Sequence, residues 1–188
     1  MKKNVLILSL LMAPLVMTAQ SIFEKYEEME NVTSVVVNQK MFKMLANIDI
    51  QTNDSDSDDF INQVKMLNNL TVFTTDDTGV STSMKKDVEK YIKNSKLEEL
   101  MRIKDGDQTV NFFVLEGKDD NHVKELLMFV NGLGDITKNE NISINGKKRV
   151  IETVLLSLTG DIDLREVSKL TSKLNVPGGE QLKKASKE

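Results

Sequence analysis

The chain has 188 residues, a formal net charge of −4 and no cysteine. This length is enough for one core and short for two. The acidic balance argues against nucleic acid and anionic membranes as main partners, and the lack of cysteine excludes disulfides.

The first nineteen residues have the pattern of a secretory signal peptide. Two lysines precede an apolar run from Val5 to Met17, and Ala19 follows shortly after. The run is shorter than the roughly 20 residues that span a bilayer, although a retained membrane anchor is the alternative. We predict a signal peptide at 1–19 cut after Ala19, and one α+β domain at 20–188, periplasmic or secreted. Lipid attachment as a bacterial lipoprotein is not expected, because it needs a cysteine at the new N-terminus and the chain has none.

The start of this domain predicts a short helix, a strand and a second helix. Ser21 can cap the short helix, which would bury Phe23 and Tyr26. The β-branched run at 32–37 predicts an interior strand. Asn38 can cap the second helix. That helix is expected to place in the core Met41, Phe42, Met44 and Leu45.

Alternating aspartates at 54–59 suggest a calcium loop. An EF-hand loop beginning at Asp54 needs glycine at its sixth position and glutamate at its twelfth, but Asp59 and Lys65 stand there. A looser calcium site remains open beside a solvated loop whose last aspartate caps a helix. The inward residues of that helix are expected to be Phe60, Ile61, Val64 and Leu67.

A strand at 70–75 is followed by the Asp-Thr-Gly triplet that begins at Asp77. Aspartic proteases carry this triplet after a hydrophobic strand and use a second, facing carboxylate. Threonines and an aspartate precede it here, and no second triplet occurs. The triplet therefore indicates a turn and an N-terminal helix signal, with Ser81 or Ser83 capping a helix at 84–93.

The stretch from Leu97 to Val130 predicts a β-meander, because three β-prone runs are separated by short polar breaks. A four-residue loop from Asp105 to Gln108 places Ile103 opposite Val110, whereas a two-residue turn places it opposite a glutamine. We prefer the longer loop because facing residues should be apolar together. Ile103 and Val110 share one face of this hairpin. Phe113 lies on the opposite face, which we expect helices to cover.

The remaining segments predict a loop, a hairpin, a strand and a helix. Residues 132–138 are expected to form the loop, and an Asn-Gly pair centres the hairpin at 142–147. The basic cluster at 147–149 fits a solvated arm or a contact with an acidic partner. The apolar run at 150–158 predicts a central strand that Gly160 breaks.

The last helix is predicted to lie on the sheet. Asp163 and Glu166 form a start similar to a capping box, and Leu164, Val167, Leu170 and Leu174 recur at helical spacing. The fold class is therefore α+β, with a mostly antiparallel sheet and helices packed chiefly on one face. The expected order is β-α-α-β-α-β-β-β, a hairpin arm, then β-α.

Several segments resemble the domain-of-unknown-function family 4252, in the same order along the chain. The matching segments are 23–26, 32–35 and 41–42 at the start, and 97–105 and 155–164 toward the end. The resemblance implies an envelope or secreted protein of Bacteroidetes-type bacteria, often a lipoprotein, with no established activity. The chain differs in lacking the lipoprotein cysteine and in an apparent insertion at 139–149. No functional residue is carried over.

No concentrated set of reactive residues occurs in the sequence. The single histidine, His122, lacks cysteine partners for zinc, and a Ser-His-Asp triad would have to use it without a Gly-x-Ser-x-Gly elbow. No phosphate loop or dinucleotide fingerprint occurs. Glu98 and Glu99 would point to opposite faces of a strand. We assign no catalytic, metal-binding or cofactor-binding residue and expect no cofactor.

The sequence thus favours a non-catalytic exported envelope protein that binds another protein in the cell envelope or a small envelope ligand. No nucleic-acid partner and no transmembrane segment after processing are expected. The alternative is a hydrolase that uses carboxylates only, on a glycan or peptide, and a structural accessory protein is a third possibility. Partner identity, oligomeric state and strand order stay open.

Overall fold

The computed structural model describes residues 22–47, 61–139, 143–144, 147–148 and 150–166. The elements, in chain order, are η3 (Glu24–Tyr26), β1 (Thr33–Asn38), α1 (Gln39–Ala46), β2 (Leu67–Thr75), α3 (Thr78–Asn94), β3 (Glu98–Asp105), β4 (Gln108–Glu116), β5 (His122–Asn131), α4 (Gly134–Asn139), β6 (Ser143–Ile144), β7 (Lys147–Lys148) and β8 (Thr153–Asp163). The signal-peptide prediction and the calcium-loop hypothesis fall outside the described residues.

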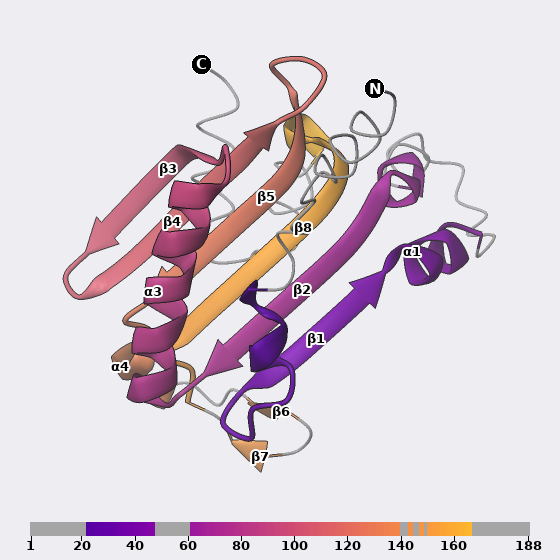
Figure 1. The fold of residues 1–188 in the computed structure, drawn as a ribbon. Coiled ribbons are helices and arrows are strands. Elements are labelled where there is room, and N and C mark those ends of the chain that lie inside the picture. Colours follow the sequence, from indigo (N-terminus) through magenta and orange to yellow (C-terminus); the bar gives the residue numbers. More distant parts are fainter. Residues whose placement is uncertain (1–21, 48–60, 140–142, 145–146, 149, 167–188) are drawn as a thin grey trace, which may run out of the picture.

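Six strands form one sheet in the order β1-β2-β8-β5-β4-β3, and every neighbouring pair is antiparallel. Helix α3 and the short helix η3 lie across the same face of this sheet (Figure 1). The α+β fold class is therefore confirmed. Strand β8 is the last of the described strands in the sequence but lies third in the sheet, as expected for a central strand.

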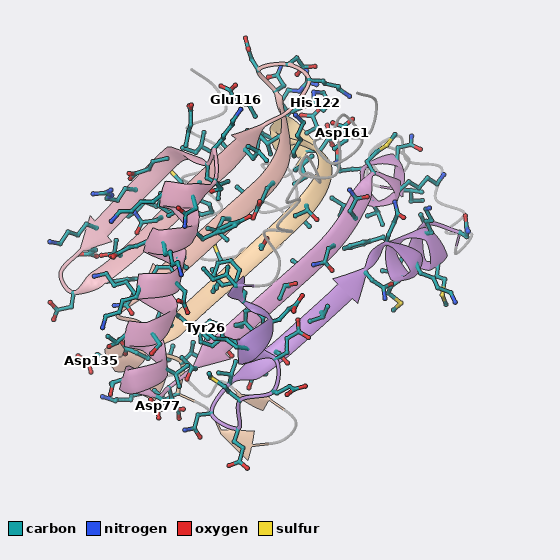
Figure 2. The ribbon with its side chains drawn as sticks, viewed as in Figure 1. Tyr26, Asp77, Glu116, His122, Asp135 and Asp161 are labelled. Atoms are coloured by element: carbon teal, nitrogen blue, oxygen red, sulfur yellow. The ribbon has the colours of Figure 1, made fainter. Side chains whose placement is uncertain are left out.

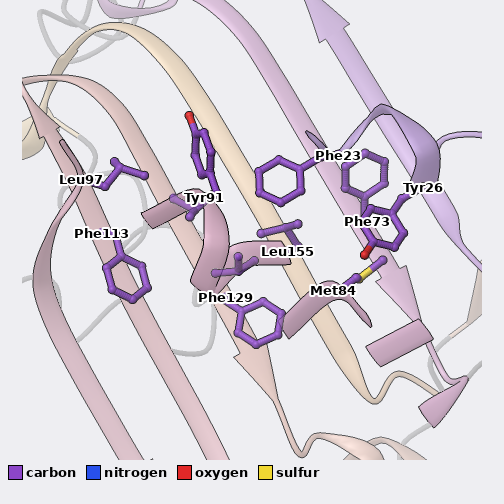
Figure 3. Close-up of a cluster of buried hydrophobic side chains, with 11 residues drawn as sticks. Phe23, Tyr26, Phe73, Met84, Tyr91, Leu97, Phe113, Phe129 and Leu155 are labelled. Atoms are coloured by element: carbon purple, nitrogen blue, oxygen red, sulfur yellow. The ribbon is translucent and has the colours of Figure 1, made fainter. Parts of the chain in front are cut away.

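The face beneath α3 holds the first hydrophobic core (Figure 3). Met84, Val88 and Tyr91 follow one another at intervals of four and three residues, so they share one side of α3 and are buried there. They meet aromatic and aliphatic residues from four strands. The buried cluster consists of Phe23, Tyr26, Phe73, Met84, Val88, Tyr91, Leu97, Phe113, Leu127, Phe129 and Leu155.

The opposite face of the sheet is apolar across all six strands. One row of facing residues runs Val35, Val72, Leu156, Met128, Phe112 and Met101. A second buried cluster lies on this face and includes Leu126 and Ile162, with Phe42 of α1 packed into it. Because residues alternate between two hydrophobic faces, the inner strands read in the sequence as almost continuous apolar runs.

The first strand and helix differ from their predicted environments. Strand β1 is an edge strand, not an interior one, and Val35 and Val36 are each 49% exposed. The Asn38 side chain accepts a hydrogen bond from the Met41 backbone nitrogen, which confirms the predicted cap of α1. Of the four expected core residues of that helix, only Phe42 is buried, and the exposed ones are Met41, Met44 and Leu45.

Helix α3 begins six residues earlier than predicted, and its cap is Asp77. One carboxylate oxygen of Asp77 accepts hydrogen bonds from the backbone nitrogens of Gly79 and Val80, at 2.8 and 2.9 Å. These bonds hold the pKa of Asp77 below its ordinary value, the bond from Val80 contributing most. The triplet is thus an N-terminal helix signal, as predicted, whereas the assignment of the cap to Ser81 or Ser83 was wrong. Ser81 is instead buried.

Ser81 anchors the first turns of α3 to the centre of the sheet. Its hydroxyl donates to the side-chain oxygen of Asn131 at 2.8 Å and lies 2.5 Å from the Thr153 hydroxyl. The single proton of the Thr153 hydroxyl can be donated either to the same Asn131 oxygen, 2.9 Å away, or to Ser81. A fully paired polar network of this kind gives a helix one fixed position on the sheet. It therefore also fixes Tyr91, near the other end of the helix.

The register of the meander is as predicted. Ile103 faces Val110 and Met101 faces Phe112. The ladder continues as far as the pair Asp105–Gln108, so the connecting turn is tighter than a four-residue loop. Gly106 adopts a positive φ of 56° in this turn, a conformation that costs glycine little.

Three further assignments differ from expectation. Residues 134–139 form helix α4 within the segment predicted to be a loop. Leu67 begins β2 and does not belong to the preceding helix, of which residues 61–65 are described. Strand β8 continues through Gly160 to Asp163. The paired segments β6 and β7 confirm the predicted hairpin arm.

Gly160 accommodates an irregularity in β8 and does not end the strand. Its φ is 151°, and a Cβ placed there would lie 2.5 Å from the carbonyl oxygen of Met66. The register between β2 and β8 shifts at this point, between Leu67 and Asn69. Glycine in a strand commonly marks such a bulge or a close backbone approach.

Gly160→Ala is therefore expected to lower the free energy of unfolding by at least about 1 kcal/mol, because alanine meets both a strained φ and a backbone oxygen. Urea unfolding with an unchanged m-value measures this. Gly106→Asn is the matched control, since a side chain there meets nothing within 4 Å and asparagine tolerates its φ. Equal midpoints for the two variants would contradict the assignment.

Candidate functional site

An open cavity of about 600 Å³ lies on the helical face of the sheet, beside α3. Its floor comes from strands β2, β8 and β5, and η3 and Tyr91 of α3 form part of its walls. The lining residues are Phe23, Glu24, Glu27, Val36, Asn38, Gln39, Asn68, Asn69, Thr71, Phe73, Tyr91, Glu125, Leu155, Ser157 and Thr159. The size is within the range of small-molecule sites.

Strand alternation places Glu125 in this cavity. Glu125 shares its face of β5 with Leu127 and Phe129, which belong to the core beneath α3. Its neighbour across the ladder on β8 is Thr159. The residue is only 7% exposed, so a carboxylate occupies a position that the apolar pattern of the strand would assign to a hydrophobic side chain.

Two neutral hydroxyl groups hold the Glu125 carboxylate. The Tyr91 hydroxyl donates to Oε2 at 2.8 Å, and the Ser157 hydroxyl donates to Oε1 at 3.1 Å. Burial raises the pKa of Glu125 above its ordinary value, although the two hydrogen bonds act in the opposite direction. Burial and the nearby Glu125 charge likewise raise the pKa of Tyr91.

The charged residues among the described lining of the cavity are all acidic. Glu24 on η3 and Glu27 directly after it are exposed, and Glu125 lies buried at the floor. Lys25, between the two exposed glutamates in sequence, pairs with Asp87 of α3 at 2.5 Å. The cavity thus combines negative charge with the amides and hydroxyls of Asn, Gln, Ser and Thr side chains.

The apolar part of the cavity is aromatic and comes from the edge of the first core. Phe23 and Tyr91 pack edge to face, with ring centroids 5.2 Å apart and an interplanar angle of 74°. Phe73 and Leu155 are almost fully buried beneath. Figure 3 shows Phe23 and Tyr91 beside Leu155, with the Tyr91 hydroxyl at one end of the cluster. A few polar groups set into an apolar wall are typical of a ligand site.

His122 belongs to a separate group of ionic side chains at one end of the sheet (Figure 2). Its Nδ1 lies 2.7 Å from Asp119 Oδ1, and its Nε2 lies 3.9 Å from Asp163 Oδ2. Asp163 is itself paired with Arg165, and Lys118 with Asp161. Within the described ranges, no group of three or more histidine, aspartate or glutamate side chains could hold a metal ion.

Three other acidic residues that the sequence singled out do not line the cavity. Asp77 caps α3, as described above, and Glu98 and Glu99 are both exposed on β3. In the described part of the chain, no helix has both the length and the apolar character needed to cross a bilayer.

Sequence reasoning missed the cavity and its buried carboxylate. The available signal was the alternation in β5, where Glu125 is two residues before Leu127 and four before Phe129. An acidic residue in register with core residues is unusual, because carboxylates are rarely fully buried without partners. Its partners Tyr91 and Ser157 lie 34 and 32 residues away, so no local motif joins the three.

The fold and the cavity define an α+β domain with an antiparallel six-stranded sheet and a polar, acidic cavity beside its helix. The model of the family "Domain of unknown function (DUF4252)" matches residues 26–170. The chain belongs to this family, which confirms the resemblance found in the sequence. Neither the curated proteins nor the solved structures that were searched contain a match.

Proposed function

We propose that this protein is a non-catalytic, exported cell-envelope protein that binds a small ligand in the cavity beside α3. The observation that carries the proposal is the cavity itself, about 600 Å³ in volume, with Glu125 and Ser157 at its floor and Tyr91 in its wall. The N-terminal pattern of two lysines, an apolar run and Ala19 supports export. A small ligand fits this geometry better than a protein partner, because the polar groups converge inside a concavity.

The geometry of Glu125 favours binding over catalysis. Each of its carboxylate oxygens already accepts a hydrogen bond from a fixed hydroxyl, so the group is oriented as a recognition element. Tyr91, one of these donors, is itself held between the core and Phe23. A site pre-formed in this way spends little free energy on ordering when a ligand binds.

A carboxylate-only hydrolase is the second candidate function. Glu24 and Glu27 line the same cavity as the buried Glu125, whose raised pKa is a property of general acids. Turnover of a glycan or peptide library that is abolished by Glu125→Gln would reverse the order of the two proposals.

Ligand binding can be tested by blocking the cavity. Thr71 lines the cavity from β2, and a tryptophan there would occupy part of it. We expect fragments from a mixed set of cationic, neutral and anionic small molecules to shift the amide NMR signals of Glu125 and Ser157, and Thr71→Trp to abolish these shifts. Val35→Trp is the control, because Val35 is half exposed on the opposite face.

The proposal fails if no fragment shifts these signals in the unmodified protein. It fails equally if Thr71→Trp, folded as judged by its amide spectrum, binds the same fragments with unchanged affinity.

A further inference from the structure

We propose that the ligand of this cavity is a small organic cation, an ammonium group on an apolar body, with the ammonium at Glu125 and the body against the aromatic wall. This inference rests on the proposed ligand-binding function and adds the chemical class of the ligand.

Among the described residues that line the cavity, no side chain compensates its negative charge. Glu125 is 7% exposed, and its hydrogen-bonding partners are the neutral hydroxyls of Tyr91 and Ser157. No lysine, arginine or histidine is among the described residues that line the cavity. Buried charges in proteins are ordinarily paired. A cation from outside the chain would supply the missing opposite charge.

The charges at the rim of the cavity are negative, like the charge of Glu125 at its floor. Glu24 on η3 and Glu27 directly after it lie at the mouth, and the nearby Lys25 forms an ion pair with Asp87. Three carboxylates in one concavity raise the local concentration of cations and repel anions. The rim thus favours the same class of ligand as Glu125 does.

The wall next to Glu125 suits an apolar body. Tyr91 places its hydroxyl on the carboxylate and its ring against Phe23. A ligand whose ammonium reaches Glu125 therefore lies beside these two aromatic rings. Cations are attracted to the faces of such rings, and apolar groups are stabilised by contact with them.

An inorganic cation fits the site less well. Calcium takes six to eight oxygen ligands and magnesium six in near-ideal geometry. The described residues offer no cluster of three or more acidic or histidine ligands. Part of the cavity lining is apolar, from Phe23, Phe73 and Leu155, and a bare metal ion would not use it.

The test compares three probes of similar shape and different charge: 2-phenylethylamine, 2-phenylethanol and 3-phenylpropionate. Each is titrated into the isotope-labelled protein at pH 8 while the amide signals of Glu125, Tyr91 and Ser157 are followed. We expect the amine to bind at least tenfold more tightly than the alcohol, and the propionate to bind least. Glu125→Gln should weaken amine binding at least tenfold and so remove the preference for the amine over the alcohol.

Two further variants keep the test decisive. Glu116→Gln on β4, which does not line the cavity, should bind all probes like the unmodified protein. Glu27→Gln at the rim should weaken amine binding by a smaller factor, and it remains informative if Glu125→Gln does not fold. Equal affinities for amine and alcohol would overturn the cation assignment while leaving ligand binding intact. If neither these probes nor the fragment set binds, the proposed function fails as well.

Discussion

Replacing Phe73 with alanine is expected to lower the free energy of unfolding by about 3 to 5 kcal/mol, the usual cost of removing a buried phenylalanine. Phe73 is 1% exposed on β2 and contacts the ring of Tyr26, with centroids 5.9 Å apart. Tyr26 is fully buried and donates a hydrogen bond to Asp87 of α3. Phe73 therefore supports both the core and the contact between η3 and α3.

Urea unfolding followed by circular dichroism measures this effect through the shift in midpoint at constant m-value. The matched control is Val35→Ala on the neighbouring strand β1, where the side chain is 49% exposed. We expect the control to change stability by less than about 1 kcal/mol, because truncating an exposed side chain removes little buried area. A Phe73→Ala variant as stable as the control would show that η3 and β2 do not pack as described.

Glu125→Gln is expected to stabilise the folded protein at pH 8, on the order of 2 kcal/mol, because a buried charge is replaced by a neutral group of similar shape. The gain depends on pH. Burial raises the pKa of Glu125 in the folded state above its ordinary value. Below the ordinary pKa the group is protonated in both the folded and the unfolded chain, so ionisation carries no penalty there.

As pH rises above the ordinary pKa, the unfolded chain releases the Glu125 proton more readily than the folded protein, and folding stability is lost until the raised pKa is passed. The difference in Tm between Glu125→Gln and the unmodified protein should thus be small at pH 4 and grow toward pH 8. Glu116→Gln, at an exposed position of β4, is the control and should show no such growth. A constant difference across this pH range would mean that Glu125 is not buried as a charge.

The meander was the most predictable part of the fold. Its strands follow one another in sequence, and the pairing of Ile103 with Val110 could be argued from apolar residues facing each other. Helix α3 was predictable from Val88 and Tyr91, although its start was placed at Met84 because the capping role of Asp77 was assigned to serines. Local signals of this kind depend on neighbouring residues alone.

The position of β1 and the cavity could not be predicted for one common reason. Both depend on pairings between strands that are distant in sequence. The run of valines at 35–37 is compatible with an interior strand, and only the insertion of β8 between β2 and β5 leaves β1 at the edge. Glu125 meets Ser157 through that same neighbouring strand. The residues in and around β5 do not indicate which strand will pair with it.

The late position of β8 in the sequence has a consequence for how the chain acquires its structure. Residues 153–163 supply the shared neighbour of β2 and β5, so both strands lack it while the chain is still emerging from the ribosome. The hairpins of the meander close over short loops, but joining the two halves requires contacts between residues nearly ninety positions apart, such as Leu70 and Leu158. Such distant contacts form slowly. We expect the nascent chain to expose hydrophobic strand edges until its final strand arrives, which makes this interval the one in which a holding chaperone matters most.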